Sequence, residues 1–195
     1  MNKQALRELY KHKRQDLPSK TRLQFDDLML IQFQKFDFSA IRKLLTYWPM
    51  PNQAEPNTHL FSGFLRHMVP GLSISYPVMD PDAHQFTAHQ IDENTVYKPG
   101  KFGVLEPDAP NPVDPETIDL VFVPLLAFDK KGHRVGYGKG FYDGFFESVS
   151  KESKKIGVNY FNPDENIDDV WEGDIPLDYL VTPRDVLSFF NKGLE

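Results

Sequence analysis

Apolar residues in the first third of the chain recur every three to four positions, which is the spacing of amphipathic helices. This spacing predicts helices over residues 3–15 and 17–36, the second with Leu23 and Leu30 on its buried face. A third helix is predicted over residues 57–69. Each of these helices is expected to bury one apolar side against the rest of the molecule.

Short apolar runs between the helices are rich in the β-branched and aromatic residues typical of strands. The clearest run is IDLVFVPLLAFD, residues 118–129, with Pro124 expected at the end of the strand. Strands that alternate with helices predict an α/β fold with a mostly parallel sheet. The predicted strands are residues 43–48, 72–79, 85–91, 118–129, 154–161 and 177–183.

A proline-rich segment, residues 98–117, interrupts this pattern. Its sequence, KPGKFGVLEPDAPNPVDPET, holds five prolines, which we expect to exclude regular structure. Loops of this length in a compact domain usually act as lids or binding loops. We therefore expect this segment to border a ligand.

Composition narrows the class of protein. The 195 residues include no cysteine, which excludes disulfides, thiolate catalysis and cysteine-based zinc sites. A net charge of -6 disfavours nucleic acid and membrane surfaces as partners. The length predicts a single domain over residues 1–195. The absence of an apolar signal core or membrane-spanning run predicts a cytoplasmic protein.

The charge is unevenly distributed. Residues 1–22 carry seven Lys or Arg against two Asp or Glu, although acids exceed bases by 28 to 22 in the whole chain. A basic first helix on an acidic body is either a solvated helix face or a local anion site. Charge alone favours the solvated face.

Glycines cluster in RVGYGKGFYD, residues 134–143, soon after the strongest predicted strand. Their spacing is G-x-G-x-G. It is not that of a Walker loop, because Lys139 is followed by glycine rather than Ser or Thr. It is not that of a dinucleotide-binding fingerprint either, because the third position after Gly138 is Phe141.

Two interpretations of this turn remain open. Glycine can take positive φ and bring backbone N–H groups close to an anion, and a following helix adds partial positive charge. Arg134 and Lys139 would add full charges. The alternative is a flexible connection whose glycines serve only turn geometry. The combination of glycines and basic residues after a strand favours an anion site.

Asp143 falls in the first turn of the helix expected after the glycines. It either compensates the helix dipole or holds Mg²⁺, which takes one or two carboxylates together with phosphate oxygens and water. A second carboxylate would have to come from elsewhere, and spacing does not choose among the acids near the C-terminal end. Those acids are Asp168, Asp169, Glu172, Asp174 and Asp178.

The histidines do not have the spacing of metal ligands. The pair His84 and His89 and the pair His59 and His67 each lack a nearby third ligand. His133, directly before the glycine-rich segment, is expected to face solvent. We therefore disfavour a mechanism based on histidine.

The segment from residue 118 to 146 resembles the signature of the 5-formyltetrahydrofolate cyclo-ligases, also called 5,10-methenyltetrahydrofolate synthetases. That signature is a strand ending in Pro followed by F-D-x-x-G-x-R-[LV]-G-x-G-x-G-[YF]-Y-D, and every position is present. The resemblance extends to KQALR at 3–7, MPNQAEPNT at 50–58, KFGVLEP at 101–107 and DIPLDYLVTP at 174–183. It therefore covers most of the chain.

The resemblance implies a role for each matching residue. Lys139, Arg134 and Arg7 would be catalytic, and Asp143 and Asp174 would hold Mg²⁺. The residues implied to bind ATP are Lys3, Gln4, Ala5, Leu6, Arg7, Arg134, Val135, Gly136, Tyr137, Gly138, Lys139, Gly140, Phe141 and Tyr142. The residues implied to bind the folate substrate are Met50, Glu55, Phe102, Tyr137, Gly138, Lys139, Gly140, Phe141 and Tyr142.

The resemblance also implies a fold and a reaction. The fold would be a three-layer α/β sandwich of the NagB/RpiA/CoA-transferase-like kind. The reaction would convert 5-formyltetrahydrofolate and ATP to 5,10-methenyltetrahydrofolate, ADP and phosphate, in a monomer that needs Mg²⁺. Two positions depart from the family pattern: Tyr137 stands where some members have Arg, and Val78 follows Pro77 where many have Arg.

Two other classes of function are considered. One is a module that binds nucleotide or folate without turnover, against which the presence of both metal acids argues. The other is an α/β isomerase or acyl-transferase, which would need a catalytic carboxylate or lysine on a different loop and no ATP.

Overall fold

The computed structural model describes residues 1–100, 102–108, 111–163 and 166–189. Its α-helices are α1 (Lys3–Gln15), α2 (Ser19–Phe33), α3 (Thr58–Met68) and α4 (Phe141–Phe146), and short 3₁₀ turns lie at η1 (Pro51–Gln53) and η2 (Pro115–Thr117). The strands of the main sheet are β1 (Lys43–Leu45), β2 (Ser73–Asp80), β3 (Gln85–Gln90), β6 (Leu120–Val123), β9 (Lys154–Val158), β10 (Tyr179–Val181) and β11 (Val186–Ser188). Two small sheets pair β4 (Tyr97–Pro99) with β5 (Leu105–Pro107) and β7 (Ala127–Phe128) with β8 (Arg134–Val135).

The main sheet has the strand order β11-β10-β9-β6-β1-β2-β3. The five inner strands run parallel to one another, whereas the edge strands β11 and β3 are antiparallel to their neighbours. The prediction of an α/β fold with a mostly parallel sheet is therefore confirmed. The strand β11 was not predicted, because three residues, none of them buried, are too few to show a pattern.

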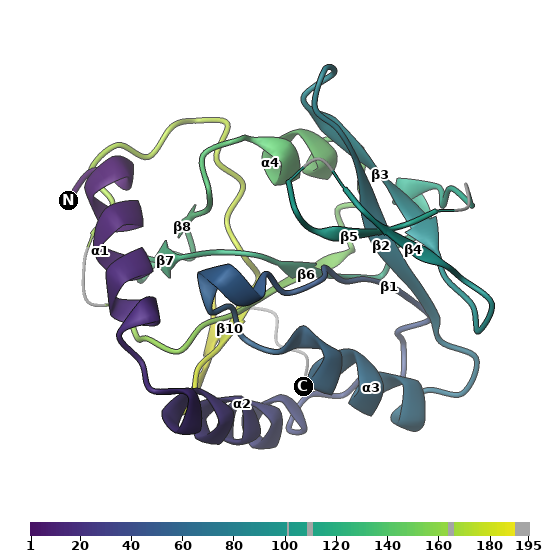
Figure 1. Cartoon of the computed structure of the whole chain (residues 1–195), viewed down its shortest axis with the longest axis horizontal. Coiled ribbons are helices and arrows are strands. Elements are labelled where there is room, and N and C mark those ends of the chain that lie inside the picture. The colour runs from purple at the N-terminus through teal and green to yellow at the C-terminus, as the bar shows by residue number, and fades with distance from the viewer. Residues whose placement is uncertain (101, 109–110, 164–165, 190–195) are drawn as a thin grey trace.

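Helices cover both faces of the sheet, α2 and α3 on one face and α4 on the other (Figure 1). Strand β6 shows why, because a strand buried on both faces alternates its side chains between two cores. Leu120 and Phe122 join the core cluster that α2 and α3 complete. Val121 and Val123 join the cluster that α4 completes. This is the three-layer arrangement that was predicted.

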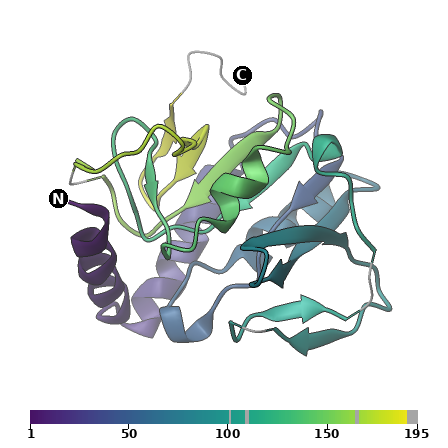
Figure 2. The ribbon, with the colours of Figure 1, turned by 90° about the horizontal axis from the view of Figure 1, so that it is seen from above.

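Helix α1 lies at one side of the sheet, and Figures 1 and 2 both place the β4–β5 hairpin at the opposite side. Leu6 and Tyr10 are buried, and they pack with Leu126 and Val135 in a third core cluster. The side chain of Asn2 caps the helix by accepting from an N–H group of its first turn at 2.8 Å. Helix α1 is therefore fixed by one buried side, which carries Arg14 as well as the two apolar residues.

Helix α2, Ser19–Phe33, lies within the predicted range 17–36, but the prediction of its buried face is partly wrong. Leu23 is 64% exposed, and the buried positions are Asp26, Met29 and Phe33. Apolar residues occur on nearly every side of this helix, so spacing alone could not select the buried one. No helix among the described residues is both long and apolar enough to cross a membrane.

The structure corrects two predictions about the proline-rich segment and the strand after it. The expectation that the prolines of segment 98–117 exclude regular structure is wrong, since most of the β4–β5 hairpin lies there. Pro99 and Pro107 fit because they lie on short edge strands, where a missing N–H group is tolerated. The strand predicted at 118–129 ends at Val123, directly before Pro124, which confirms the expected role of this proline. Of the residues after Pro124, Ala127 and Phe128 form β7, which pairs with β8 in a separate sheet.

Gly157 of β9 provides a test of how tightly the sheet packs. A Cβ atom on Gly157 would lie 2.8 Å from Cδ1 of Leu177 and 2.9 Å from Cδ2 of Leu125. We expect Gly157→Ala to lower the free energy of unfolding by about 1–3 kcal/mol through overpacking, measured by urea denaturation. Gly63→Ala is the control, because nothing lies within 4 Å of its Cβ position in α3 and alanine favours a helix. Equal stability of Gly157→Ala and the unaltered chain would contradict this account.

Candidate active site

The topology of the sheet marks one place where a ligand pocket is expected. From β1 the chain passes to β2 on one side and then returns to β6 on the other side of β1. Open parallel sheets bind ligands at the carboxyl ends of their strands, at such a switch point. A cavity of about 620 Å³ lies there, lined by Tyr47 and Trp48, which follow β1, and by Pro124, which follows β6.

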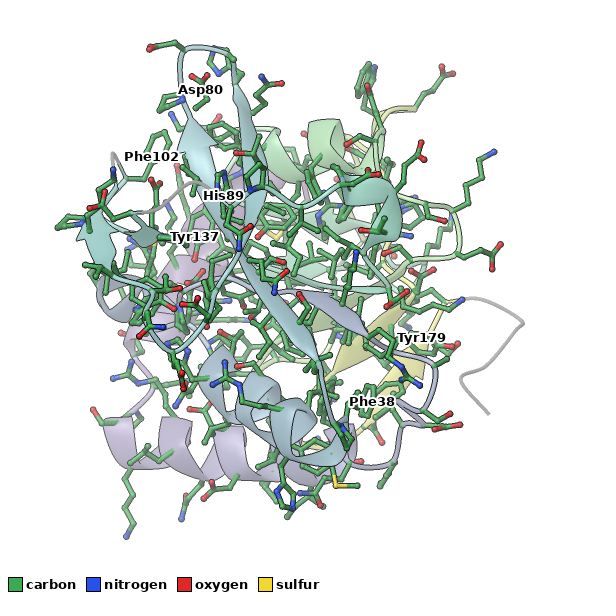
Figure 3. The ribbon with its side chains drawn as sticks, turned by 90° about the vertical axis from the view of Figure 1, so that its right-hand side faces the viewer. Phe38, Asp80, His89, Phe102, Tyr137 and Tyr179 are labelled. Carbon is green, nitrogen blue, oxygen red and sulfur yellow. The ribbon has the colours of Figure 1, made fainter. Side chains whose placement is uncertain are left out.

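Most of the site residues predicted from the sequence line this cavity, although they are far apart along the chain. They come from α1, the segment after β1, the β4–β5 loop, the glycine-rich turn and the segment before β10; Figure 3 labels two of them, Phe102 and Tyr137. The predicted residues that line the cavity are Lys3, Arg7, Met50, Glu55, Phe102, Arg134, Gly136, Tyr137, Gly138, Lys139, Gly140, Phe141, Tyr142, Asp143 and Asp174.

Four residues implied to bind ATP do not line the cavity. The side chains of Leu6 and Val135 lie in the core cluster beneath α1, Gln4 is exposed, and Ala5 is half-buried. Residues four apart share one face of a helix, so the residues between two cavity-lining positions of α1 point elsewhere. A role for these four residues in ATP binding stays a prediction.

The glycine-rich turn has the backbone conformation that glycine adopts most easily. Gly138 has φ +83° and Gly140 has φ +72°. A Cβ atom on Gly138 would also lie 3.1 Å from Cζ of Arg7. Glycine therefore permits both the turn and its close approach to α1, and Lys139 is exposed between the two glycines.

Both predicted metal acids form ion pairs with predicted phosphate-binding cations. Oδ1 of Asp143 accepts from Nη2 of Arg134 at 2.7 Å, and Oδ2 of Asp174 accepts from Nζ of Lys3. Burial alone would raise the pKa of Asp174, but hydrogen bonds from Lys3 and from the main-chain N–H of Trp171 hold it below its ordinary value. Opposite charges are therefore matched in pairs along this part of the cavity wall.

The structure separates the five acids that spacing could not rank. Asp174 lines the cavity, and the other four do not. Asp168 binds the N-terminal ammonium group at 2.8 Å, and Asp169 accepts from the first main-chain N–H of α1. Asp178 accepts from a main-chain N–H of β9, and Glu172 is exposed.

Glu55 is a buried carboxylate, 8% exposed, in another part of the cavity wall. Its Oε1 accepts from the hydroxyl of Tyr137 at 2.6 Å, and its Oε2 accepts from the main-chain N–H of Met50 at 2.7 Å. Burial raises the pKa of Glu55, and these two hydrogen bonds oppose the rise. The carboxylate is therefore held in one orientation.

Aromatic rings complete the wall. The rings of Phe102 and Phe141 meet edge to face, with centroids 5.7 Å apart, and the ring of Tyr142 lies 5.0 Å from that of Phe86. The hydroxyl of Tyr142 is buried without a hydrogen-bond partner among the described residues. The wall therefore offers flat apolar surface together with one unsatisfied hydroxyl.

No histidine is found among the described residues that line the cavity. Nor do the described residues contain a group of three His, Cys, Asp or Glu side chains that could hold a metal ion. The expectation that His133 faces solvent is wrong, because its Nδ1 lies 3.0 Å from Oδ2 of Asp129 and the side chain is half-buried. It stabilises the β7–β8 turn.

Sequence reasoning missed several residues of the cavity wall. The carboxyl-end rule for parallel sheets would have found the residues that directly follow β1 and β6, once the strand order was known. The remaining ones come from loops, from β2 and from the end of α4, and carry no signal of their own. The missed residues include Tyr47, Trp48, Pro77, Met79, Val104, Pro124, Glu147 and Trp171.

The cavity lies at the switch point of the sheet and has charge pairs in one part of its wall and a carboxylate with aromatic rings in another. These features define the class of protein: it is an α/β enzyme suited to an anionic ligand beside a flat ring. Comparison with known proteins names the family. The model of the 5-formyltetrahydrofolate cyclo-ligase family matches residues 2–183. The chain belongs to this family, as its resemblance to the family signature predicted.

Individual relatives agree. A 5-formyltetrahydrofolate cyclo-ligase of Mycoplasma genitalium is 30% identical over 180 residues, which are 91% of this chain and 96% of that protein. A cyclo-ligase of Haemophilus influenzae is 38% identical over 88 residues, 41% of this chain and 47% of its own. The NMR structure of Aquifex aeolicus 5,10-methenyltetrahydrofolate synthetase matches with a TM-score of 0.80 and 28% identity, over 100% of this chain and 97% of that one. These names support cyclo-ligase activity.

Proposed function

We propose that the chain is a cytoplasmic enzyme that uses ATP and Mg²⁺ to convert 5-formyltetrahydrofolate to 5,10-methenyltetrahydrofolate, ADP and phosphate. The observation that carries this proposal is the composition of one cavity. Basic side chains and two carboxylates line one part of it, and aromatic rings with a buried carboxylate line another. A nucleotide triphosphate and a pterin ring have these two complementary chemistries.

The phosphate half of the proposed site is built from α1 and the glycine-rich turn. Lys139 is exposed in the turn, and Arg7 of α1 donates from Nε to the main-chain oxygen of Gly136 at 3.0 Å. Lys3 and Arg134 line the same cavity. Phosphoryl transfer depends mainly on positioning and charge neutralisation, which these four cations are suited to supply.

The folate half is proposed to lie against Glu55 and the aromatic residues. Each oxygen of an ionised carboxylate can accept more than one hydrogen bond, so Glu55 could also accept from the N–H groups of the pterin. Phe102, Phe141 and Tyr142 would contact the faces and edges of the ring. The hydroxyl of Tyr142 would then gain the partner it lacks among the described residues.

The proposed chemistry needs no protein nucleophile, in keeping with a chain that has no cysteine. The formyl oxygen attacks the γ-phosphorus of ATP, and ADP departs. The 10-nitrogen then attacks the formyl carbon, loses its proton and closes a five-membered ring. The carbon–oxygen bond breaks, and the oxygen leaves with the phosphate. The protein holds the reactants in line and stabilises the phosphate charge.

The residues present fit a magnesium ion. Mg²⁺ takes only one or two protein carboxylates and completes its shell with water and phosphate oxygens, so a cluster of three acids is not required. Asp143 and Asp174 both line the cavity, beside Lys3 and Arg134. When bound, Mg²⁺ would neutralise phosphate charge. Asp143 and Asp174 would hold it.

An absorbance assay tests the proposal. The protein is mixed with 5-formyltetrahydrofolate, and formation of the methenyl product is followed by its absorbance. We expect an increase that requires both ATP and Mg²⁺. Tight binding of ATP without product would instead indicate a module that binds without turnover. Product formation without ATP would contradict the proposed mechanism.

A further inference from the structure

A chain of hydrogen bonds joins α1 to the part of the cavity wall that contains Glu55. Nη1 of Arg14 donates to the hydroxyl oxygen of Tyr137 at 3.3 Å, and that hydroxyl donates to Oε1 of Glu55 at 2.6 Å. Tyr137 and Glu55 line the cavity, whereas Arg14 does not and is fully buried at 0% exposure. Arg14 therefore reaches the cavity only through Tyr137.

A buried arginine is costly unless its charge is compensated. Nη2 of Arg14 donates to the main-chain oxygen of Leu125 at 2.6 Å, just beyond the end of β6. The carboxylate of Glu55 supplies the opposite charge through the hydroxyl of Tyr137. Loss of one member leaves the others without compensation, so the three side chains act as a unit.

Arg14 lies on the same side of α1 as the proposed phosphate-binding cations. Lys3, Arg7 and Arg14 are spaced by four and seven residues, which places them along one helix face. Arg7 contacts Gly136 of the glycine-rich turn. The first residues of this face of α1 thus lie at the nucleotide half of the proposed site, and Arg14 near the end of the helix connects to Glu55 through Tyr137.

In the part of the chain that the structure describes, the ionisable groups that interact with Glu55 are Tyr47, Tyr137, Tyr142 and Arg14. Arg14 is the cation among these four. Burial raises the pKa of each of these tyrosines, so they remain neutral hydroxyls. The hydroxyl of Tyr137 and the charge of Arg14 both favour the ionised form of Glu55.

We propose that Arg14 and Tyr137 are positioning residues, which hold the Glu55 carboxylate in one orientation toward the pterin ring of 5-formyltetrahydrofolate. The inference rests on the proposed function and deepens it. It assigns two roles to the basic residues of α1: Arg14 affects the affinity for folate, and the cations nearer the start of the helix affect the binding of ATP. The main chain of Tyr137 stays available to the phosphates.

Tyr137→Phe tests the inference, because it removes one hydroxyl and keeps the ring. A hydrogen bond to a buried carboxylate is among the stronger ones, so we expect KM for 5-formyltetrahydrofolate to rise about tenfold or more. KM for ATP should change less than about twofold. Steady-state kinetics with each substrate varied in turn measure both values.

The pH dependence provides a readout that a purely structural role would not move. The pterin N–H groups require an ionised Glu55 as acceptor, so kcat/KM for folate rises as Glu55 loses its proton. The hydroxyl of Tyr137 lowers the pKa of Glu55. Its loss raises that pKa, and the acid limb of kcat/KM for folate should move to higher pH in Tyr137→Phe.

Two variants of Arg14 and one control complete the design. Arg14→Met should raise KM for folate as Tyr137→Phe does, and Arg14→Lys, which keeps the charge, should recover part of the loss. Tyr76→Phe is the control, because it also removes a buried hydroxyl, one that pairs with Nδ1 of His59 at 3.4 Å and does not line the cavity. Its KM for folate should equal that of the unaltered chain.

The outcomes distinguish the inference from the function on which it rests. Turnover by the unaltered chain, with a selective rise in folate KM and a shifted acid limb in Tyr137→Phe, supports the inference. Turnover with an unchanged folate KM in Tyr137→Phe, or with equal rises for both substrates, overturns the inference alone. Absence of turnover in the unaltered chain overturns the proposed function and the inference with it. Should Arg14→Met fail to fold, Tyr137→Phe still decides.

Discussion

Lys139→Ala is expected to lower turnover at least about 100-fold while leaving the fold intact. Lys139 is exposed in the glycine-rich turn, so its truncation opens no cavity in the core. Lys139 lines the cavity, where the proposed reaction builds up charge on the transferring phosphate. Removal of one such stabilising group from an active site typically costs about two to three orders of magnitude in rate.

The measurement is kcat in the absorbance assay, together with urea unfolding to confirm an unchanged fold. Lys130→Ala is the matched control, because Lys130 is an exposed lysine of the nearby β7–β8 turn that does not line the cavity. We expect its kcat to stay within about twofold of the unaltered chain, as is usual for surface positions. Retained turnover in Lys139→Ala would show that this lysine does not act on the phosphate.

Asp143→Asn is expected to raise the Mg²⁺ concentration needed for half-maximal activity at least about tenfold, since even indirect partners of a metal change its affinity by this much. Asparagine keeps the Oδ1 acceptor for Arg134 and for the main-chain N–H of Ile175, at 2.7 and 3.4 Å in the present structure. It removes the negative charge. The local structure should therefore persist while the metal is lost.

The measurement is a Mg²⁺ titration of activity at saturating ATP. Glu172→Gln removes the same charge from an exposed acid near Asp174 that does not line the cavity, and its titration should match that of the unaltered chain. A titration of Asp143→Asn that also matches the unaltered chain would remove Asp143 from the metal site.

Local patterns predicted most of the fold. Helix α1 begins and ends where its sequence pattern does, and the apolar run of β6 marks the centre of the sheet. The failures occur where tertiary contacts decide. Leu23 is exposed because α2 has apolar residues on several sides, and Pro99 lies in a strand because its edge position tolerates it.

Spacing alone could predict only the contiguous part of the site, and the parts that folding brings together were named only through the resemblance to the family. The turn around Lys139 is recognisable from the sequence because its residues are neighbours. The pairing of Lys3 with Asp174 joins residues 171 positions apart, a separation at which no spacing rule applies. Arg14 was missed for a related reason: a basic residue on a basic helix is usually solvated, and only the fold buries it beside Tyr137.

The two ion pairs in the cavity wall have a consequence for the order of binding. Asp143 pairs with Arg134, and Asp174 pairs with Lys3. A metal ion that bound alone to the two carboxylates would leave Arg134 and Lys3 without their ion-pair partners. A triphosphate that bound alone to the two basic side chains would leave Asp143 and Asp174 without theirs. When both bind, the metal ion would pair with the carboxylates and the triphosphate with the basic side chains, so no charge would lose its partner. Binding of each ligand would therefore strengthen binding of the other. Under the proposed function, the wall would thereby favour the metal–nucleotide complex over either component.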